Sequence, residues 1–246
     1  MARPKLNRKP APQMEVARRS LDAQAADKLR DAILTGVFAP GEKLTEEVIA
    51  GSFGLSRGTI RASLRLLVHE GLIVQEPYRG YSVRSLTSRD AWELFTLRNT
   101  LEAFAARLLA ETITEEKRDR LDQAYDKVVK AVTSGVRTRA VEADFQLHLT
   151  ITELTEHSAL QAHYALIAGQ VRLYQSLVSK FLSLQDYIVT HESLIAAMRE
   201  GRAGEAERLA SEHNTSDGER LVEWLREAEG QSEDRIRGGS VGLSVS

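Results

Sequence analysis

Four residues in the second half of the chain could bind a metal ion: Asp144, His148, His191 and His213. Asp144 and His148 are four residues apart, which places them on one face of a helix. His191 and His213 lie 11 residues on either side of position 202, so an antiparallel helical hairpin around Gly201–Gly204 would bring them level. Three imidazoles and a carboxylate suit zinc, nickel, manganese or a similar divalent ion. The alternative is that these are separate histidines, each hydrogen-bonded or partly exposed.

Arg98 could hold the carboxylate of a small ligand. It borders an apolar seam of a predicted helix, formed by Leu94, Leu97, Leu101, Phe104 and Leu108. A guanidinium group binds a carboxylate with two parallel hydrogen bonds. The alternative is an ion pair with Glu102, four residues further along the helix. Asn214 and Arg172 are weaker candidates for the same ligand, because they only neighbour apolar stripes.

A third group of residues could read DNA. Arg57, Arg61 and Arg65 recur every four residues, and no acid occurs between Ser56 and His69. The three guanidinium groups therefore share one helix face and have no partner within that helix. Such a face suits a major groove, where arginine binds phosphate or guanine. The first residues of a recognition helix usually meet base edges, which favours Arg57 and Arg61, whereas Arg65 suits a phosphate. Ser56 and Thr59 at the start of the helix are further predicted contacts. The alternative is a solvated basic face.

Arg79-Gly80 lies at the predicted tip of a hairpin and could add a contact with DNA. It places a cation beside a residue without a side chain, so the backbone can approach DNA closely. The alternative is an ordinary tight turn.

The elements that must position the arginines form a small N-terminal domain over residues 20–85. We expect helices over about 21–35, 46–53 and 57–69, followed by short strands over 72–75 and 81–84. Three helices followed by a hairpin is a winged helix-turn-helix arrangement. Residues 1–19 contain six Lys and Arg and three prolines, which predicts a basic, disordered arm.

The rest of the chain has no strand signal and predicts an all-helical bundle over residues 86–229. We expect six helices, over about 89–110, 115–133, 138–155, 159–181, 184–200 and 203–228. The Gly/Ser-rich residues 230–246 predict a disordered tail. The fold class is therefore mainly α, with a winged helix-turn-helix domain in front of a helical bundle of about six helices.

Charge and composition limit the function classes. Residues 1–84 hold 14 Lys and Arg against 9 acids, a net charge of +5, whereas residues 85–246 hold 19 against 26, a net charge of −7. The basic N-terminal part suits binding to a polyanion. The alternative is an uneven distribution of surface charge without a binding role. The chain has no cysteine, which excludes disulfides, zinc ribbons and thiol nucleophiles. With no apolar stretch of about 20 residues and no apolar signal region, we expect a cytoplasmic protein with no membrane partner.

The stretch GEKLTEEVIAGSFGLSRGTIRASLRLLVHEGLIVQEPYRGYSV resembles the winged-helix domain of GntR-type transcription regulators. Together with the helical rear, residues 21–228 resemble the FadR-type subfamily with its FCD domain, in the shorter, VanR-like variant with six helices. Gly58 and Thr59 replace the family's common Thr-Pro, and Ala62-Ser63 its common Glu-Ala, so half-site sequences cannot be copied from relatives.

The resemblance also implies ligands. Many FCD domains carry an Asp-x-x-x-His pair and two later histidines as a metal site, and Asp144, His148, His191 and His213 match it one by one, with zinc as the first choice. Similar proteins often use an arginine such as Arg98, with the metal, to hold a small organic acid.

The sequence thus predicts a transcription regulator, most simply a repressor, that binds double-stranded operator DNA and responds to a small carboxylate effector. We expect a homodimer, because a single winged helix buries too little surface for tight specific binding. The alternatives are a regulator that senses the metal itself and, far behind, a metal-dependent hydrolase. The sequence has no HExxH motif and no Gly-rich phosphate loop, so we expect no catalysis.

Overall fold

The computed structural model describes residues 20–238, and side chains as far as Gly230. In this range the chain forms three short strands and nine helices. The strands are β1 Lys43–Leu44, β2 Ile73–Glu76 and β3 Gly80–Val83. The helices are α1 Leu21–Leu34, α2 Glu46–Phe53, α3 Arg57–His69, α4 Ser88–Glu111, α5 Glu115–Thr133, α6 Arg137–Leu154, α7 Ser158–Val178, α8 Asp186–Arg199 and α9 Ala203–Gly238.

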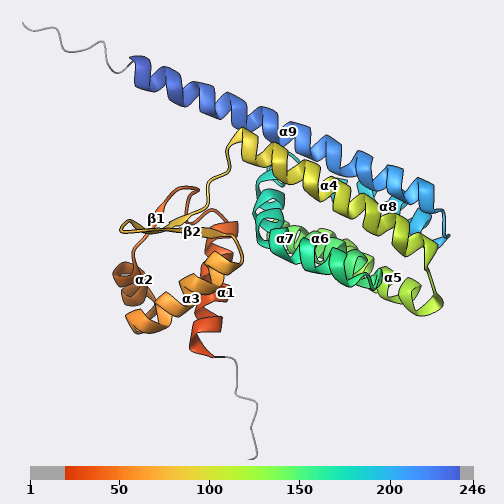
Figure 1. Ribbon diagram of the computed structural model, residues 1–246, viewed down its shortest axis with the longest axis horizontal. Helices are drawn as coiled ribbons and strands as arrows, with labels where there is room; N and C mark the ends of the chain where they lie inside the picture. The colour runs from red at the N-terminus through yellow and green to blue at the C-terminus, as the bar shows by residue number, and fades with distance from the viewer. Residues whose placement is uncertain (1–19, 239–246) are drawn as a thin grey trace, which may run out of the picture.

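The N-terminal head consists of α1–α3 and a three-stranded antiparallel sheet in the order β1-β3-β2 (Figure 1). Helix α3 begins at Arg57 because the Ser56 side chain accepts the Thr59 N–H at 3.1 Å and caps the helix. Ile60, Leu64 and Leu67 form its fully buried stripe, which leaves the arginine face outside. The winged helix-turn-helix arrangement is confirmed, and β1 is an additional short strand that the sequence pattern did not reveal.

The rear domain is a bundle of six helices, α4–α9, as predicted. Helices α4 and α9 run side by side along its length, with α5–α8 packed beneath them (Figure 1). Helix α4 starts at a capping box, in which the Thr87 side chain and Asp90 each accept the other's backbone N–H. Gly218 of α9 lies against the ring of Phe95, so closely that a Cβ there would overlap the ring. No helix within residues 20–238 is both long and apolar enough to cross a membrane.

The predicted disordered tail over 230–246 is wrong in its first part, because α9 continues to Gly238. The prediction rested on the Gly/Ser-rich composition of the whole tail, but a single glycine inside a helix, such as Gly230, costs only about 1 kcal/mol. Residues 219–229 before it are dominated by good helix formers. The predicted basic arm over 1–19 and the last residues, 239–246, lie outside the described residues.

Head and bundle contact each other where the C-terminal end of α3 meets α7. Gly169 lies against the backbone carbonyl of Glu70, and a Cβ at this glycine would overlap that carbonyl oxygen. The neighbouring Gly71, in the left-handed region at φ +74°, lies against the side chain of Gln170. The contact therefore depends on the absence of a side chain at position 169.

We expect Gly169→Ala to push the head away from α7 or to strain both elements, which lowers the free energy of unfolding by about 1–3 kcal/mol. Urea denaturation measures this loss. Gly204→Ala in α9 is the matched control, since nothing lies within 4 Å of its Cβ position, and alanine there should stabilise the helix by up to about 1 kcal/mol. Equal unfolding midpoints for the two variants would contradict the close contact.

Candidate functional site

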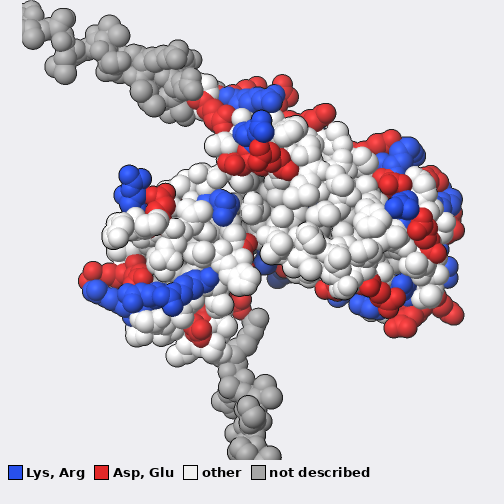
Figure 2. All heavy atoms as spheres, in the orientation of Figure 1, with Lys and Arg blue, Asp and Glu red and all other residues white. Residues whose placement is uncertain are grey.

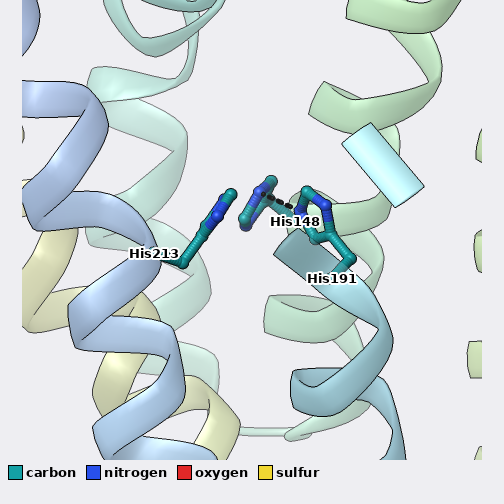
Figure 3. A group of neighbouring side chains, drawn as sticks. All are labelled: His148, His191 and His213. Carbon is teal, nitrogen blue, oxygen red and sulfur yellow. Dashed lines mark hydrogen bonds between the residues drawn. The ribbon is translucent and has the colours of Figure 1, made fainter. Parts of the chain in front are cut away.

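Three histidines from three helices meet inside the rear bundle (Figure 3). His148 comes from α6, His191 from α8 and His213 from α9, and one ring nitrogen of each lies within 4.8 Å of the others. The ring centroids of His191 and His213 are 4.4 Å apart. The hairpin predicted around Gly201–Gly204 is present, and it brings these two histidines level.

Hydrogen bonds fix the orientation of two of the rings. His148 Nδ1 lies 2.9 Å from the Glu102 carboxylate, and His191 Nδ1 lies 2.9 Å from the Tyr187 carbonyl oxygen. Neutral rings that donate Nδ1–H to these acceptors leave Nε2 with its lone pair. The two Nε2 atoms face each other at 3.2 Å. Histidines that bind metals are oriented in this way, with the second ring nitrogen on a carboxylate or carbonyl.

Asp144 adds a negative charge at the same point. Its Oδ1 lies 3.2 Å from His191 Nε2 and 3.8 Å from His148 Nε2, and within residues 20–238 it has no hydrogen-bond partner. Its other oxygen accepts a hydrogen bond from Gln175 at 2.6 Å. With both rings in this tautomer, two imidazole lone pairs and a carboxylate oxygen converge on one point, an arrangement that a cation would stabilise.

Burial keeps two of the histidines neutral. It lowers the pKa of His191, against the opposing effect of Asp144. Burial and the neighbouring His191 and His148 hold the pKa of His213 well below its usual value. Neutral imidazole is the form that binds a metal ion, so these two histidines are available as ligands at neutral pH.

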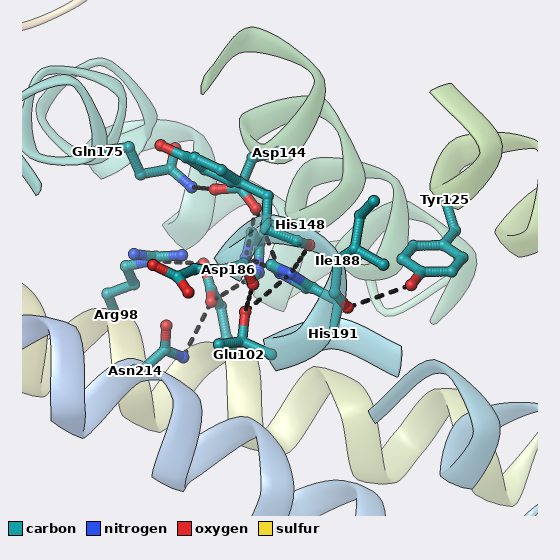
Figure 4. A network of polar contacts seen from close by, with 12 residues as sticks. Arg98, Glu102, Tyr125, Asp144, His148, Gln175, Asp186, Ile188, His191 and Asn214 are labelled. Atoms are coloured by element: carbon teal, nitrogen blue, oxygen red, sulfur yellow. Dashed lines mark hydrogen bonds and ion pairs between the residues drawn. The ribbon is translucent and has the colours of Figure 1, made fainter. Parts of the chain in front are cut away.

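A buried ion pair between Arg98 and Glu102 adjoins the histidines (Figure 4). The Arg98 Nε donates to Glu102 at 2.7 Å, and both side chains are at least 96% buried. Tyr164 and Asn214 donate to the same carboxylate at 2.7 and 3.0 Å. Burial acts to raise the pKa of Glu102, but Arg98 and His148 outweigh it and hold that pKa well below the usual range. Glu102 is therefore an anion that connects Arg98 to His148.

Several polar atoms around this ion pair are buried without a hydrogen-bond partner among the described residues. Arg98 Nη2 is one donor, and the Tyr174 hydroxyl is another, with its ring 5.7 Å from the Arg98 guanidinium. The Asn214 side-chain oxygen is an acceptor in the same position. Unsatisfied buried polar groups are rare in proteins, and these would be satisfied by a polar ligand.

The cavity beside the histidines is very small. Glu102, His148, His213 and Asn214 help to line a space of about 10 Å³. A volume of this size holds about one water molecule or ion. A small organic acid would therefore require the surrounding helices to move apart.

Asp217, on α9 near Arg98, gives a prediction for pH. Burial raises its pKa to about 6, from 3.8, so its contribution to stability is complete below pH 3.8 and is lost as the pH rises through 6. We expect Asp217→Asn to gain stability relative to the wild type between pH 4 and pH 7. Urea denaturation of both proteins at the two pH values measures this difference. An unchanged difference would show that the carboxylate is not held in an apolar environment.

The structure brings together most of the predicted ligand residues but not all of them. Asp144, the three histidines, Arg98 and Asn214 lie in one network. Arg172 does not, because it pairs with Glu142 on α6 and lines a different cavity. The ion pair of Arg98 with Glu102 is present as the alternative predicted. From the sequence, Glu102 was named only as the partner of Arg98. The position of both residues on an apolar stripe, four residues apart, is the signal that could have indicated a buried Glu102 at the site. Nothing in the sequence singled out Tyr164 or Gln175.

The arginines of α3 lie on the outside of the head, and two of them pair with acids of a neighbouring helix rather than of their own. Arg61 donates two hydrogen bonds to Glu46, at 2.8 and 2.7 Å, and Arg57 pairs with Glu47 at 2.6 Å. Both acids come from the first turn of α2, and this contact between two helices is not visible in the periodicity of either one. Figure 2 shows the positive side chains in a row along this edge of the head, with acidic ones next to them. Arg65 makes no ion pair within the described part of the chain.

The tip of the hairpin between β2 and β3 is fully exposed. Arg79 lies 3.4 Å from Glu76 in a largely exposed ion pair. Gly80 has φ +86°. Tyr78, two residues earlier, has φ +63°, and its whole side chain is in solvent. A positive φ is unusual for an aromatic residue, so the tip holds Tyr78 outward at some conformational cost.

Both domains match known protein families. Residues 21–83 match bacterial regulatory proteins of the gntR family, and residues 93–216 match the FCD domain. The second match alone covers half of the chain.

Relatives with similar sequences are transcriptional regulators. The HTH-type transcriptional regulator YdhC of Bacillus subtilis is 31% identical over 139 residues, which span 56% of this chain and 62% of that protein. The probable D-xylose utilization operon transcriptional repressor of Paenarthrobacter nicotinovorans is 23% identical, over 80% of this chain and 87% of its own length. The gluconate operon transcriptional repressor of Bacillus subtilis is 26% identical, over 75% and 78%.

Solved structures share the fold. McbR/YncC of E. coli superposes with a TM-score of 0.67 at 18% identity, over 85% of this chain and 99% of that one. A GntR regulator from Rhodococcus sp. RHA1 gives a TM-score of 0.64 at 22% identity, over 84% and 98%.

Proposed function

The chain belongs to the gntR family of bacterial regulatory proteins, in the group with an FCD domain, and we propose that it is an operator-binding repressor controlled by a metal ion and a small organic acid. DNA-binding transcriptional regulation is the function of this family and of its relatives, which are not enzymes. The observation that carries the finer proposal is the convergence of three histidines and Asp144 inside the domain behind the DNA-binding head.

We assign DNA reading to the exposed face of α3 and to the tip of the hairpin. The residues are Ser56, Arg57, Thr59, Arg61, Arg65, Arg79 and Gly80. An ion pair with α2 does not remove Arg61 from this role, because Glu46 holds its guanidinium in one orientation at the surface. DNA phosphates or guanine edges then compete with the Glu46 carboxylate for the Arg61 guanidinium. Ion pairs at the protein surface contribute only about 1 kcal/mol or less to stability.

We assign the metal to Asp144, His148, His191 and His213, with zinc as the first choice for this donor set. The fit rests on the Nε2 atoms of His148 and His191, which face each other at 3.2 Å while each Nδ1 lies on an acceptor. A bound divalent ion would supply positive charge for the carboxylate of an effector. Arg98 Nη2 and the Tyr174 hydroxyl, which are donors without partners, would orient that carboxylate from the other side.

Control of DNA binding follows from the small volume of the site. The space of about 10 Å³ beside the histidines must enlarge before an acid can enter, so the acid binds only a bundle whose helices have moved. Helix α7 connects the two places, because it carries both Gln175, which donates to Asp144, and Gly169, which contacts the head. A ligand that prefers one packing of the bundle therefore shifts the position of the head. In a homodimer, this shift would change the spacing of two heads on two half-sites.

A second candidate is a regulator that responds to the metal ion itself. The observation that favours it is the same small cavity beside His148 and His213, whose volume suits an ion better than an organic acid. The two candidates differ in one respect: a metal sensor changes its DNA affinity when zinc is added alone, whereas the acid-controlled repressor needs zinc and a carboxylate together.

The DNA-binding part is tested by fluorescence anisotropy on the DNA upstream of the protein's own coding sequence. We expect salt-sensitive specific binding, weakened by Arg61→Gln about 5- to 150-fold, which corresponds to about 1–3 kcal/mol. Arg208→Gln is the control, because Arg208 is equally exposed but pairs with Glu212 in the first turns of α9, at the end of the bundle away from the head (Figure 1). Equal losses in both variants, or no specific binding at micromolar protein, would refute this DNA interface.

A further inference from the structure

A large cavity lies between the head and the rear bundle, away from the histidines. Its volume is about 1030 Å³, against about 10 Å³ beside the histidines, and the two cavities share no lining residue. Pockets for small molecules usually measure about 300–1,000 Å³. This cavity is therefore large enough for a small molecule as it stands, whereas the helices around the histidines would have to move apart before an organic acid could enter there.

The walls of this cavity are mainly apolar and come from both domains. The head contributes the end of α1, the loop after it and the end of β3, and the bundle contributes α5, α6 and α7. The apolar side chains include Leu34, Phe38, Val83, Val141, Leu173 and Leu177. An occupant must therefore have an apolar body.

The charged side chains at the same cavity are mostly cations. Five are basic and two acidic, which gives a net charge of +3; they are Lys127, Arg137, Arg139, Arg172, Lys180, Asp31 and Glu142. In a chain whose bundle is acidic overall, this local excess of positive charge favours an anion.

Arg172 offers a donor for that anion. It is half-buried, pairs with Glu142 on one side and lies 5.4 Å from the ring of Phe145. Its side chain lines the cavity and keeps 19% of its surface exposed, so an anion can reach the guanidinium. We propose that this interdomain cavity is a second ligand site, which takes an anion with an apolar body, such as an alkyl or aryl carboxylate, and holds it with Arg172 and Lys127.

A ligand in this cavity would touch the head and the bundle at once. Its binding would favour the arrangement in which α1 faces α6 and α7, and would so fix the head relative to the bundle. The site gives the protein a second input to DNA binding that does not require the histidines.

The experiment uses 1-anilinonaphthalene-8-sulfonate, an aromatic anion that fluoresces in apolar sites, with the full chain. We expect saturable binding of one dye per chain. Decanoate should displace the dye, while decyltrimethylammonium, with a similar tail but a positive charge, should not. Ser176→Phe fills the cavity from α7, where Ser176 is half-buried, and should weaken dye binding at least tenfold.

Charge variants provide the matched comparison. Arg172→Gln should weaken binding about tenfold, as expected for the loss of a charge-assisted hydrogen bond. Lys127→Gln should weaken it less, and Lys130→Gln, one turn along α5 but outside the cavity, should leave it unchanged. Circular dichroism checks that each variant is folded, and if Ser176→Phe does not fold, the charge variants decide. Equal dye affinity in Arg172→Gln, Lys127→Gln and wild type, or equal displacement by both decyl compounds, would overturn the proposal.

Discussion

His191→Ala should lower the affinity of the protein for zinc at least 100-fold. The substitution removes one of three imidazole ligands, so that only His148, His213 and Asp144 remain to bind the ion. Zinc at 100 times its dissociation constant stabilises the wild type by about 2.7 kcal/mol, and this stabilisation should fall to about 0.4 kcal/mol or less in the variant at the same concentration. Isothermal titration calorimetry gives the affinity, and a thermal melt with zinc or EDTA gives the stabilisation.

His163→Ala is the matched control for this prediction. His163 also lies on a helix of the bundle, but its side chain is exposed and its Nδ1 contacts only the Ala159 carbonyl oxygen. We expect wild-type zinc binding in this variant. If both alanine variants bind zinc as the wild type does, the ion is held elsewhere.

Glu102→Ala should destabilise the protein by about 3–5 kcal/mol, because it leaves the Arg98 guanidinium buried without a counter-charge. The same change removes the acceptor for Tyr164 and Asn214. His148 also loses the carboxylate that orients it, so zinc affinity should fall about 10- to 100-fold. Urea denaturation measures the loss of stability, and calorimetry measures the loss of affinity.

Glu111→Ala separates the effect of burial from that of charge removal. Glu111 pairs with Arg107 on the same helix, also four residues apart, but both side chains are substantially exposed. Exposed pairs contribute about 0–1 kcal/mol, so this variant should remain close to the wild type. Similar losses in the two variants would mean that Glu102 is not the buried anion of the site.

Local patterns in the sequence were sufficient for the architecture of the chain. The buried stripe of Ile60, Leu64 and Leu67 and the turn residues around it predicted the head, and the breaks between apolar stripes predicted the six helices of the bundle. The end of α9 was missed because a Gly/Ser-rich composition outweighed helix propensity in the prediction. Strand β1 has only two residues, which is too short for an alternating pattern to be visible.

The site was predictable only as far as helix periodicity and one hairpin could align residues. These placed Asp144 beside His148 and His191 level with His213. The contacts between helices distant in the sequence were not visible, so Gln175 on Asp144 and Tyr164 on Glu102 were missed. The pairing of Arg61 with Glu46 was missed for the same reason, as was the pairing of Arg172 with Glu142, which places Arg172 at the cavity between head and bundle and away from the histidines.

The most direct test of the central claim is an X-ray absorption spectrum at the zinc edge of the protein loaded with one equivalent of zinc. We expect three imidazole nitrogen neighbours and one carboxylate oxygen at about 2.0–2.2 Å, and a spectrum with one imidazole fewer for His191→Ala. A shell of oxygen neighbours without imidazole, or the same spectrum for both proteins, would contradict a metal centre in the bundle.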